Sequence, residues 1–264
     1  MVNTISSSSL NNAQDAIAKS LRQLSSGLRL NSAADDPAAA SVAVSLSAQA
    51  MGLLQAATNA TNGISLTDTA GGAVGQIGDT LQQMRQLAVQ AGDGALSAAD
   101  KLGIQNQFGQ LSQQLNQIAG QAQFNGQNLL DGTFSSQIQT GANPGQTVPI
   151  SIGNLSSGAL GVANLDVTSA GGAASALNAI DSALGVVSTQ QSQLGAASSA
   201  FAAAQSNATV AAENVVAANS RISDTDYAAA TATLAQNRIQ AQAAVKALSM
   251  YNQIQKQQVT SLLP

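Results

Sequence analysis

The 264-residue sequence contains no cysteine and no histidine. Without cysteine the chain forms neither disulfides nor a reactive thiolate. Without histidine it lacks the usual general base at neutral pH and the commonest metal ligand. The acidic clusters Asp35-Asp36 and Asp224-x-Asp226 do not fit the twelve-residue calcium loop, and we expect them to cap helix ends. These absences argue against an enzyme, and we expect no cofactor and no metal site.

Charged and aromatic residues are also scarce. Only 8% of residues are charged and 2% are aromatic, whereas about a quarter of residues are charged in typical soluble domains. Nine Lys and Arg residues and a net charge of −4 argue against nucleic acid as a partner, because nucleic-acid binding uses a basic patch. A surface with so few charges is poorly protected against association, which favours a protein that packs against copies of itself.

The sequence also lacks the usual targeting segments. The first residues, MVNTISSSSLNN, have neither a basic nor an apolar region of the kind found in secretory signals, so we expect no cleaved signal peptide. No apolar run approaches the roughly eighteen residues of a membrane-spanning helix, so we expect no membrane insertion.

Near the N-terminus, large apolar residues recur with the spacing of a coiled-coil stripe, within a helix expected from about Ser9 to Leu30. Asp15 and Lys19 are four residues apart and could form an ion pair on this helix. The spacing alone fits either a core helix within one domain or a helix that needs a partner. The stripe consists of Leu10, Ile17, Leu21, Leu24 and Leu28.

A second stripe occupies the C-terminal end, in a helix that Ser223 or Asp224 could cap. Either terminal helix alone would be marginal in water, so we expect the first and last 40 or so residues to lie side by side. We also predict that they are largely disordered in the monomer and become ordered on assembly. The residues of this second stripe are Leu234, Ile239, Val245, Leu248, Tyr251, Ile254, Val259 and Leu262.

Between the two ends, apolar periodicity predicts helices over residues 41–92, 97–122 and 173–220, with Ser97 as an N-cap. Residues 124–170, rich in Gly, Asn and Pro, predict an elbow. Within it, SSQIQT and TVPISI form a β-hairpin, and Pro149 confines its strand to an edge. The expected fold is therefore mainly α: a long, antiparallel, rod-shaped helical bundle or coiled coil with a small β-hairpin elbow.

Six sequence blocks resemble bacterial flagellins, in the family's order and over nearly the whole chain. They are LSSGLRLNSAADDPA, ATNATNGISLTDTA, QQMRQLAVQAG, QFNGQNLLDG, SRISDTDYAAATATLAQNRI and VTSLL. Flagellins often carry large variable domains between the QFNG block and the C-terminal helices. Here only the elbow stands there, so the chain looks like a short flagellin.

The resemblance implies a structural subunit that self-assembles into the flagellar filament used for swimming. Residues 1–40 and 221–264 would pair as the inner tube, through the two stripes named above, and residues 41–220 would form the outer-tube layer. It further implies leaderless export through the flagellar type III apparatus to an extracellular filament. An export chaperone, a cap and hook-junction proteins are the implied partners.

The resemblance also bears on the vertebrate receptor that recognises flagellins. Family members that activate it strongly carry an Arg and a Glu at positions that align with Gln83 and Gln107, while Leu87 keeps its matching leucine. Losing both charges should weaken recognition, so we expect a poor agonist.

Two other functions remain open from the sequence. A hook–filament junction protein shares both terminal helices but would add only a short collar. A surface adhesin-like homologue would use the Ser-, Thr- and Asn-rich elbow to hold a glycan.

Overall fold

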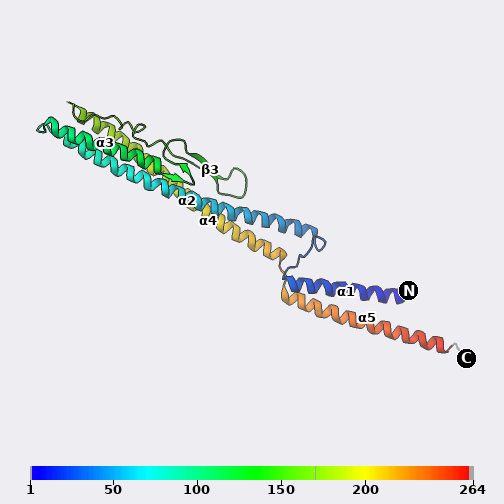
Figure 1. The fold of residues 1–264 in the computed structure, drawn as a ribbon. Coiled ribbons are helices and arrows are strands. Elements are labelled where there is room, and N and C mark those ends of the chain that lie inside the picture. The colour runs from blue at the N-terminus through cyan, green and yellow to red at the C-terminus, as the bar shows by residue number, and fades with distance from the viewer. Residues whose placement is uncertain (1, 170, 262–264) are drawn as a thin grey trace. The chain divides into compact units, whose positions relative to one another are not determined.

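The computed structural model describes the backbone of residues 2–169 and 171–261, and the side chains of residues 8–169 and 171–258. The predicted fold class, mainly α-helical with a small β elbow, is confirmed (Figure 1). The helices are α1 (Val2–Ser26), α2 (Pro37–Ala91), α3 (Ala98–Gln121), α4 (Gly172–Ser223) and α5 (Tyr227–Ser261). The strands are β1 (Gln123–Phe124), β2 (Gln127–Asn128), β3 (Ser135–Gln139) and β4 (Thr147–Ser151).

The chain divides into two compact units. The terminal unit comprises Met1–Gln49 and Glu213–Pro264, and the central unit comprises Ala50–Ala212. Helices α2 and α4 each contribute residues to both units.

The hydrophobic core of the central unit is built from one face each of α2, α3 and α4, closed by the elbow. The elbow contributes Leu129, Leu130, Leu155 and Val162, all of which are fully buried. The largest fully buried side chains of the three helices are Ile77, Leu81, Met84, Phe108, Leu115, Ile180 and Phe201.

Helix α3 begins where the sequence predicts. The Ser97 hydroxyl accepts from the Asp100 N–H at 3.2 Å, and Asp100 Oδ2 accepts from the Ser97 N–H at 3.1 Å. This reciprocal capping box satisfies two N–H groups that have no partner inside the helix. The Ser97 hydroxyl, together with its N–H, holds the pKa of Asp100 below its usual value.

The predicted hairpin is present as β3 and β4, paired antiparallel from Ser135 opposite Ser151 to Gln139 opposite Thr147. A second, smaller hairpin of β1 and β2 was not predicted. Its turn residues, Asn125 and Gly126, have φ of 50° and 77°. Asn-Gly favours this left-handed pair of conformations, so the sequence did carry the signal.

Helix side-chain amides hold the irregular part of the elbow in place. Gln105 of α3 donates through Nε2 to the Leu165 carbonyl at 2.9 Å and accepts at Oε1 from the Val167 N–H at 2.8 Å. Asn116 and Gln190 each accept one more hydrogen bond from an elbow N–H, at 2.9 and 3.0 Å. The side-chain amides thus provide hydrogen-bond partners for elbow backbone groups that no strand pairs with.

Among the described helices, α2 is long and apolar enough by composition to cross a membrane. An eighteen-residue window of it reaches a mean hydropathy of 1.4, with 6% of the window buried. The expectation that no apolar run approaches this length is therefore wrong for α2 by composition, because alanine and valine raise the average although serine and glutamine are interspersed among them. The absence of membrane insertion stays a prediction.

Candidate self-association surface

Helices α1 and α5 lie side by side and antiparallel in the terminal unit (Figure 1). On α1, Ala13 and Ser20 are buried, and Leu10, Ile17 and Leu24 are half-buried. Their spacing alternates between three and four residues, as in a coiled-coil seam. Three of the five residues in the predicted N-terminal stripe therefore face α5.

The other two predicted residues lie off this seam. Leu21 is at its edge and 45% exposed. Leu28 is 40% exposed and lies beyond the end of α1. The helix ends before it because Gly27 takes a left-handed φ of 72°. Small residues, Ala13 and Ser20, occupy the seam instead and allow the two helices to approach closely. Whether Leu21 and Leu28 contact another copy stays a prediction.

The matching seam of α5 begins at Ala230, which is 8% exposed. It then continues at the same alternation of three and four residues through half-buried positions. Leu234, Leu248 and Tyr251, all predicted, belong to it. The complete set of half-buried seam residues is Leu234, Asn237, Ala241, Ala244, Leu248 and Tyr251.

Three other predicted residues of α5 are exposed: Ile239 at 66%, Val245 at 52% and Ile254 at 52%. Ile239 and Met250, which is 61% exposed and eleven residues after Ile239, lie on the side of α5 opposite the seam, and Ile254 lies one turn after Met250 at the edge of that side. An eleven-residue spacing keeps side chains on one face of a helix. We call Ile239, Met250 and Ile254 the outer stripe. The Val259 side chain and Leu262 lie outside the described residues.

The outward side of α1 differs in character, because it carries the exposed residues Gln14, Asp15 and Arg22. Lys19 does not pair with Asp15 as predicted. Its Nζ lies 3.0 Å from Oδ1 of Asp35, in the turn after the helix. The outer side of α5 thus carries the outer stripe beside exposed polar residues such as Lys246, whereas the outer side of α1 is polar.

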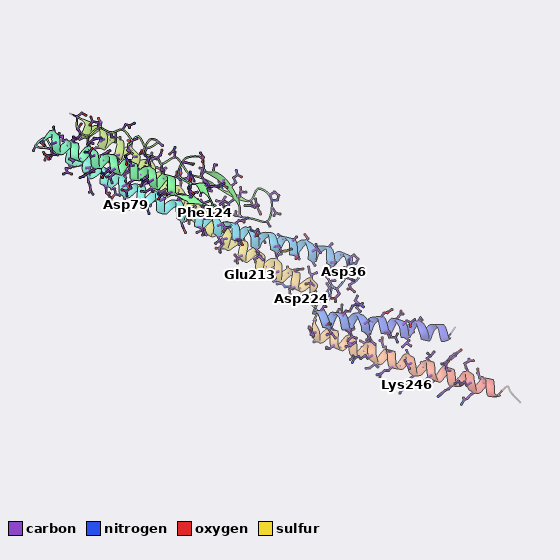
Figure 2. All side chains as sticks on the ribbon, in the orientation of Figure 1. Asp36, Asp79, Phe124, Glu213, Asp224 and Lys246 are labelled. Atoms are coloured by element: carbon purple, nitrogen blue, oxygen red, sulfur yellow. The ribbon has the colours of Figure 1, made fainter. Side chains whose placement is uncertain are left out.

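The two turns that flank the helix pair are joined by main-chain hydrogen bonds. The Arg29 N–H donates to the Ser223 carbonyl at 2.7 Å, and the Thr225 N–H donates to the Gly27 carbonyl at 2.9 Å. Between them, Leu28 and Asp224 form an isolated antiparallel β-bridge. Figure 2 labels Asp224 in this region.

Side chains strengthen the same junction. The Arg29 guanidinium donates twice to the Ile222 carbonyl, from Nε at 3.1 Å and Nη2 at 2.6 Å. The Tyr227 hydroxyl donates to the Leu24 carbonyl at 2.6 Å. We call residues 27–29 and 222–227 the clasp. It unites the SGLR and SRISDTDY blocks, two segments that carry the family resemblance.

The acidic clusters cap helices, although not all at the predicted residues. Asp226, not Ser223 or Asp224, caps α5 by accepting from two N–H groups in its first turn at 2.9 and 3.1 Å. Asp224 instead accepts from the Ser220 hydroxyl. Asp36 (Figure 2) accepts from the Ala39 N–H at 3.0 Å and caps α2.

Gln83, Leu87 and Gln107, the predicted receptor contacts, line one groove of about 430 Å³ between α2 and α3. The two helices contribute the same pattern, Q-x-x-Q-L-x-x-Q, from Gln83 and from Gln107. The groove is therefore walled by neutral amides around two leucines, a repetition that the sequence analysis missed. Its lining residues are Gln83, Gln86, Leu87, Gln90, Gln107, Gln110, Leu111 and Gln114.

Within residues 2–169 and 171–261, no group of three or more His, Cys, Asp or Glu side chains is placed to hold a metal ion. The two features described above that could contact another molecule are the terminal helix pair and the groove between α2 and α3.

Two family models match the chain. The bacterial flagellin N-terminal helical region matches residues 1–135, and the bacterial flagellin C-terminal helical region matches residues 177–263. The chain belongs to the bacterial flagellin family. The N-terminal match includes α1 and α2, and the C-terminal match includes both sides of the α4–α5 turn.

Similar proteins fall into two groups by length. The chain is 38% identical over 248 residues to the flagellin of Halalkalibacterium halodurans, covering 93% of this flagellin and 91% of that relative. It is 35% identical over 271 residues to the flagellar filament 33 kDa core protein of Treponema phagedenis, with 96% and 94% coverage. Against the Shigella flexneri flagellin the identity is 40% over 171 residues, which span 65% of this chain but only 31% of that relative.

Solved structures of related fold include the Bacillus cereus flagellin. It superposes with a TM-score of 0.51 at 24% identity, over 57% of this chain and 88% of that chain. A putative flagellar hook-associated protein of Vibrio parahaemolyticus gives a TM-score of 0.60 at 15% identity, over 72% and 100%. These likenesses establish the fold alone.

Proposed function

We propose that this flagellin is a structural subunit that polymerises into the extracellular flagellar filament, and that it has no catalytic role. The observation that carries the proposal is the outer stripe, three large apolar side chains more than half exposed on one helix face. Family membership supports the same function, as does a relative named as a filament core protein that matches over 94% of its length.

Covering the outer stripe with a neighbouring copy would remove apolar surface from water, at about 25 cal/mol per Å². Summed over many neighbours, this gain offsets the entropy of ordering the terminal helices. In this proposal the outer stripe contacts a different surface of the neighbouring copy, because a patch that met only itself would close a dimer. Unlike surfaces in contact produce a head-to-tail arrangement, which continues as an open helical polymer.

The layer assignment belongs to this proposal. Residues 1–40 and 221–264 form the inner tube of the filament, and residues 41–220 form the outer-tube layer. The subunit leaves the cell through the flagellar type III apparatus without a cleaved signal peptide. An export chaperone shields the apolar C-terminal helix before export, and a cap and hook-junction proteins contact the filament ends.

Seeded polymerisation tests the proposal. Replacing the outer stripe by Ile239→Gln, Met250→Gln and Ile254→Gln should abolish elongation from filament seeds, as seen by negative-stain microscopy. Leu102→Gln, on α3 and 58% exposed, is the control and should elongate normally. Normal filaments from the triple variant would contradict the proposal. A short collar from the unmodified protein would instead identify a junction protein.

A further inference from the structure

The seam of α1 repeats itself every seven residues. Leu10, Ile17 and Leu24 supply the large positions, and Ala13 and Ser20 the small ones. If α1 slid by one heptad along α5, leucine would replace isoleucine and serine would replace alanine, so α5 would meet nearly the same surface. Seam packing alone therefore selects the register of these helices only weakly.

The clasp lies immediately beside the ends of both helices. Its main-chain hydrogen bonds run in opposite directions, from Arg29 to Ser223 and from Thr225 to Gly27. Such a reciprocal pair holds for one alignment of the two segments only. A slip of seven residues would move the partners about 10 Å apart, at 1.5 Å per helical residue.

Two side chains reinforce this one alignment. Arg29 directs two donors at a single carbonyl 193 positions away in the sequence, that of Ile222. Tyr227, the first residue of α5, donates to the Leu24 carbonyl in the last turn of α1. Each of these bonds joins a residue near the end of one helix to the opposite turn, so each would be lost on slipping.

We propose that Arg29 and Tyr227 are positioning residues that fix the register of α1 against α5, and that the clasp, not the seam, sets which side chains form the association surface. The inference about assembly rests on the proposed function, whereas the inference about register does not. The clasp joins residues 27–29 to residues 222–227, so during synthesis it forms only after residues 222–227 have been made.

Spin-label distances on the full chain test the register directly. The chain has no cysteine, so Ala18→Cys and Ala235→Cys, both at exposed positions near the clasp, accept labels without background. Electron–electron double resonance in dilute solution should give one narrow distance for the otherwise unmodified chain. Arg29→Lys combined with Tyr227→Phe should add a second population, displaced along the helix axis by one heptad or about 10 Å.

Arg22→Lys, at an exposed position on the outward side of α1, is the matched control and should leave the single distance unchanged. Tyr227→Phe alone removes one hydroxyl and should give a smaller second population. This single variant keeps the test valid if the double variant unfolds the terminal unit. An unchanged narrow distance in both clasp variants would overturn the inference, as would a broad distribution in the unmodified chain.

Seeded elongation of the same proteins separates the two proposals. If the clasp variants lose their single distance and elongate at least tenfold more slowly than the Arg22→Lys control, both stand. If register depends on the clasp but even the unmodified chain fails to form filaments, the clasp stands and the proposed function fails. If the variants keep one register, the clasp fails whatever the filaments do.

Discussion

At the scale of single residues, one glycine of α2 decides how closely α4 can approach. A Cβ added to Gly63 would lie 2.9 Å from two ring carbons of Phe201. Phe201 is fully buried, at 0% exposure, so its ring has little room to move. The Phe201 ring of α4 thus packs against α2 at Gly63, where the absence of a side chain leaves room for it.

Gly63→Ala should therefore destabilise the central unit by about 1–3 kcal/mol, the usual cost of overpacking a core. Gly71→Ala on the same helix, where an added Cβ has no neighbour within 4 Å, should stabilise the chain by up to about 1 kcal/mol. Urea unfolding monitored by circular dichroism would measure both. Equal effects of the same sign would contradict this account of the contact.

A second residue-scale prediction concerns Asp35, whose pKa is held below the ordinary value of 3.8. The Lys19 hydrogen bond is the main cause, and the N–H groups of Asn31 and Ser32 contribute. A lowered folded-state pKa means that the stabilisation is present above 3.8 and is lost as pH falls through the lower folded value. Lys19→Met should move the Asp35 pKa back toward 3.8, as measured by carboxyl-carbon NMR titration.

The control for that titration is Asp100, whose pKa is lowered by Ser97 and not by a lysine. Its titration should be the same in the Lys19→Met variant and in the unmodified chain. If the Asp35 pKa is the same in the Lys19→Met variant and in the unmodified chain, the N–H groups of the turn alone set that pKa.

The amide-lined groove supports a third prediction. We expect weak activation of the vertebrate flagellin receptor, because Gln83 and Gln107 offer no charge. Gln83→Arg combined with Gln107→Glu should raise potency in a reporter-cell assay by tenfold or more, since charged hydrogen bonds exceed neutral ones by about 1 kcal/mol or more. Full potency of the unmodified protein would contradict the expectation, and Gln82→Arg, outside the groove, serves as the control.

At the scale of elements, the sequence predicted which segments are helices better than which residues pair them. Large apolar residues marked both terminal stripes, yet the seam of α1 runs through Ala13 and Ser20, and that of α5 through Ala241 and Ala244. The pattern of large apolar side chains does not indicate these small residues. They are buried because the two helices approach each other closely.

The clasp could not be predicted from the sequence for a different reason. Arg29 and Ile222 lie 193 positions apart, and neither has a local spacing that indicates the other. The β1–β2 hairpin, in contrast, was available from Asn125-Gly126 and was overlooked. Local turn chemistry can be read from the sequence, whereas contacts between distant turns need the fold.

The elbow gives an element-scale prediction. Gln105→Leu removes both the donor to Leu165 and the acceptor for Val167, so these backbone groups lose their partners. Hydrogen exchange at Val167 should accelerate by about fivefold, corresponding to the roughly 1 kcal/mol of one hydrogen bond. Gln113→Leu, exposed on the same helix, should leave this exchange rate unchanged, and an unchanged rate in Gln105→Leu would contradict the anchoring role.

At the scale of the whole molecule, the terminal helices have partners of their own within one chain. The clasp and the seam hold the turns of α1 and α5 nearest Gly27 and Tyr227. We therefore expect the helix gained on polymerisation to come from the parts of α1 and α5 farthest from the clasp. Circular dichroism before and after assembly would measure this gain, and unchanged helicity would show that the ends are already ordered in the monomer.

The central claim is that the apolar ends of this flagellin become fully buried only between neighbouring copies. Seeded filament growth by the chain lacking Leu234–Pro264, compared with the full chain at equal concentration, tests it most directly. We predict no elongation without this segment. Filaments of normal length from the shortened chain would contradict the claim.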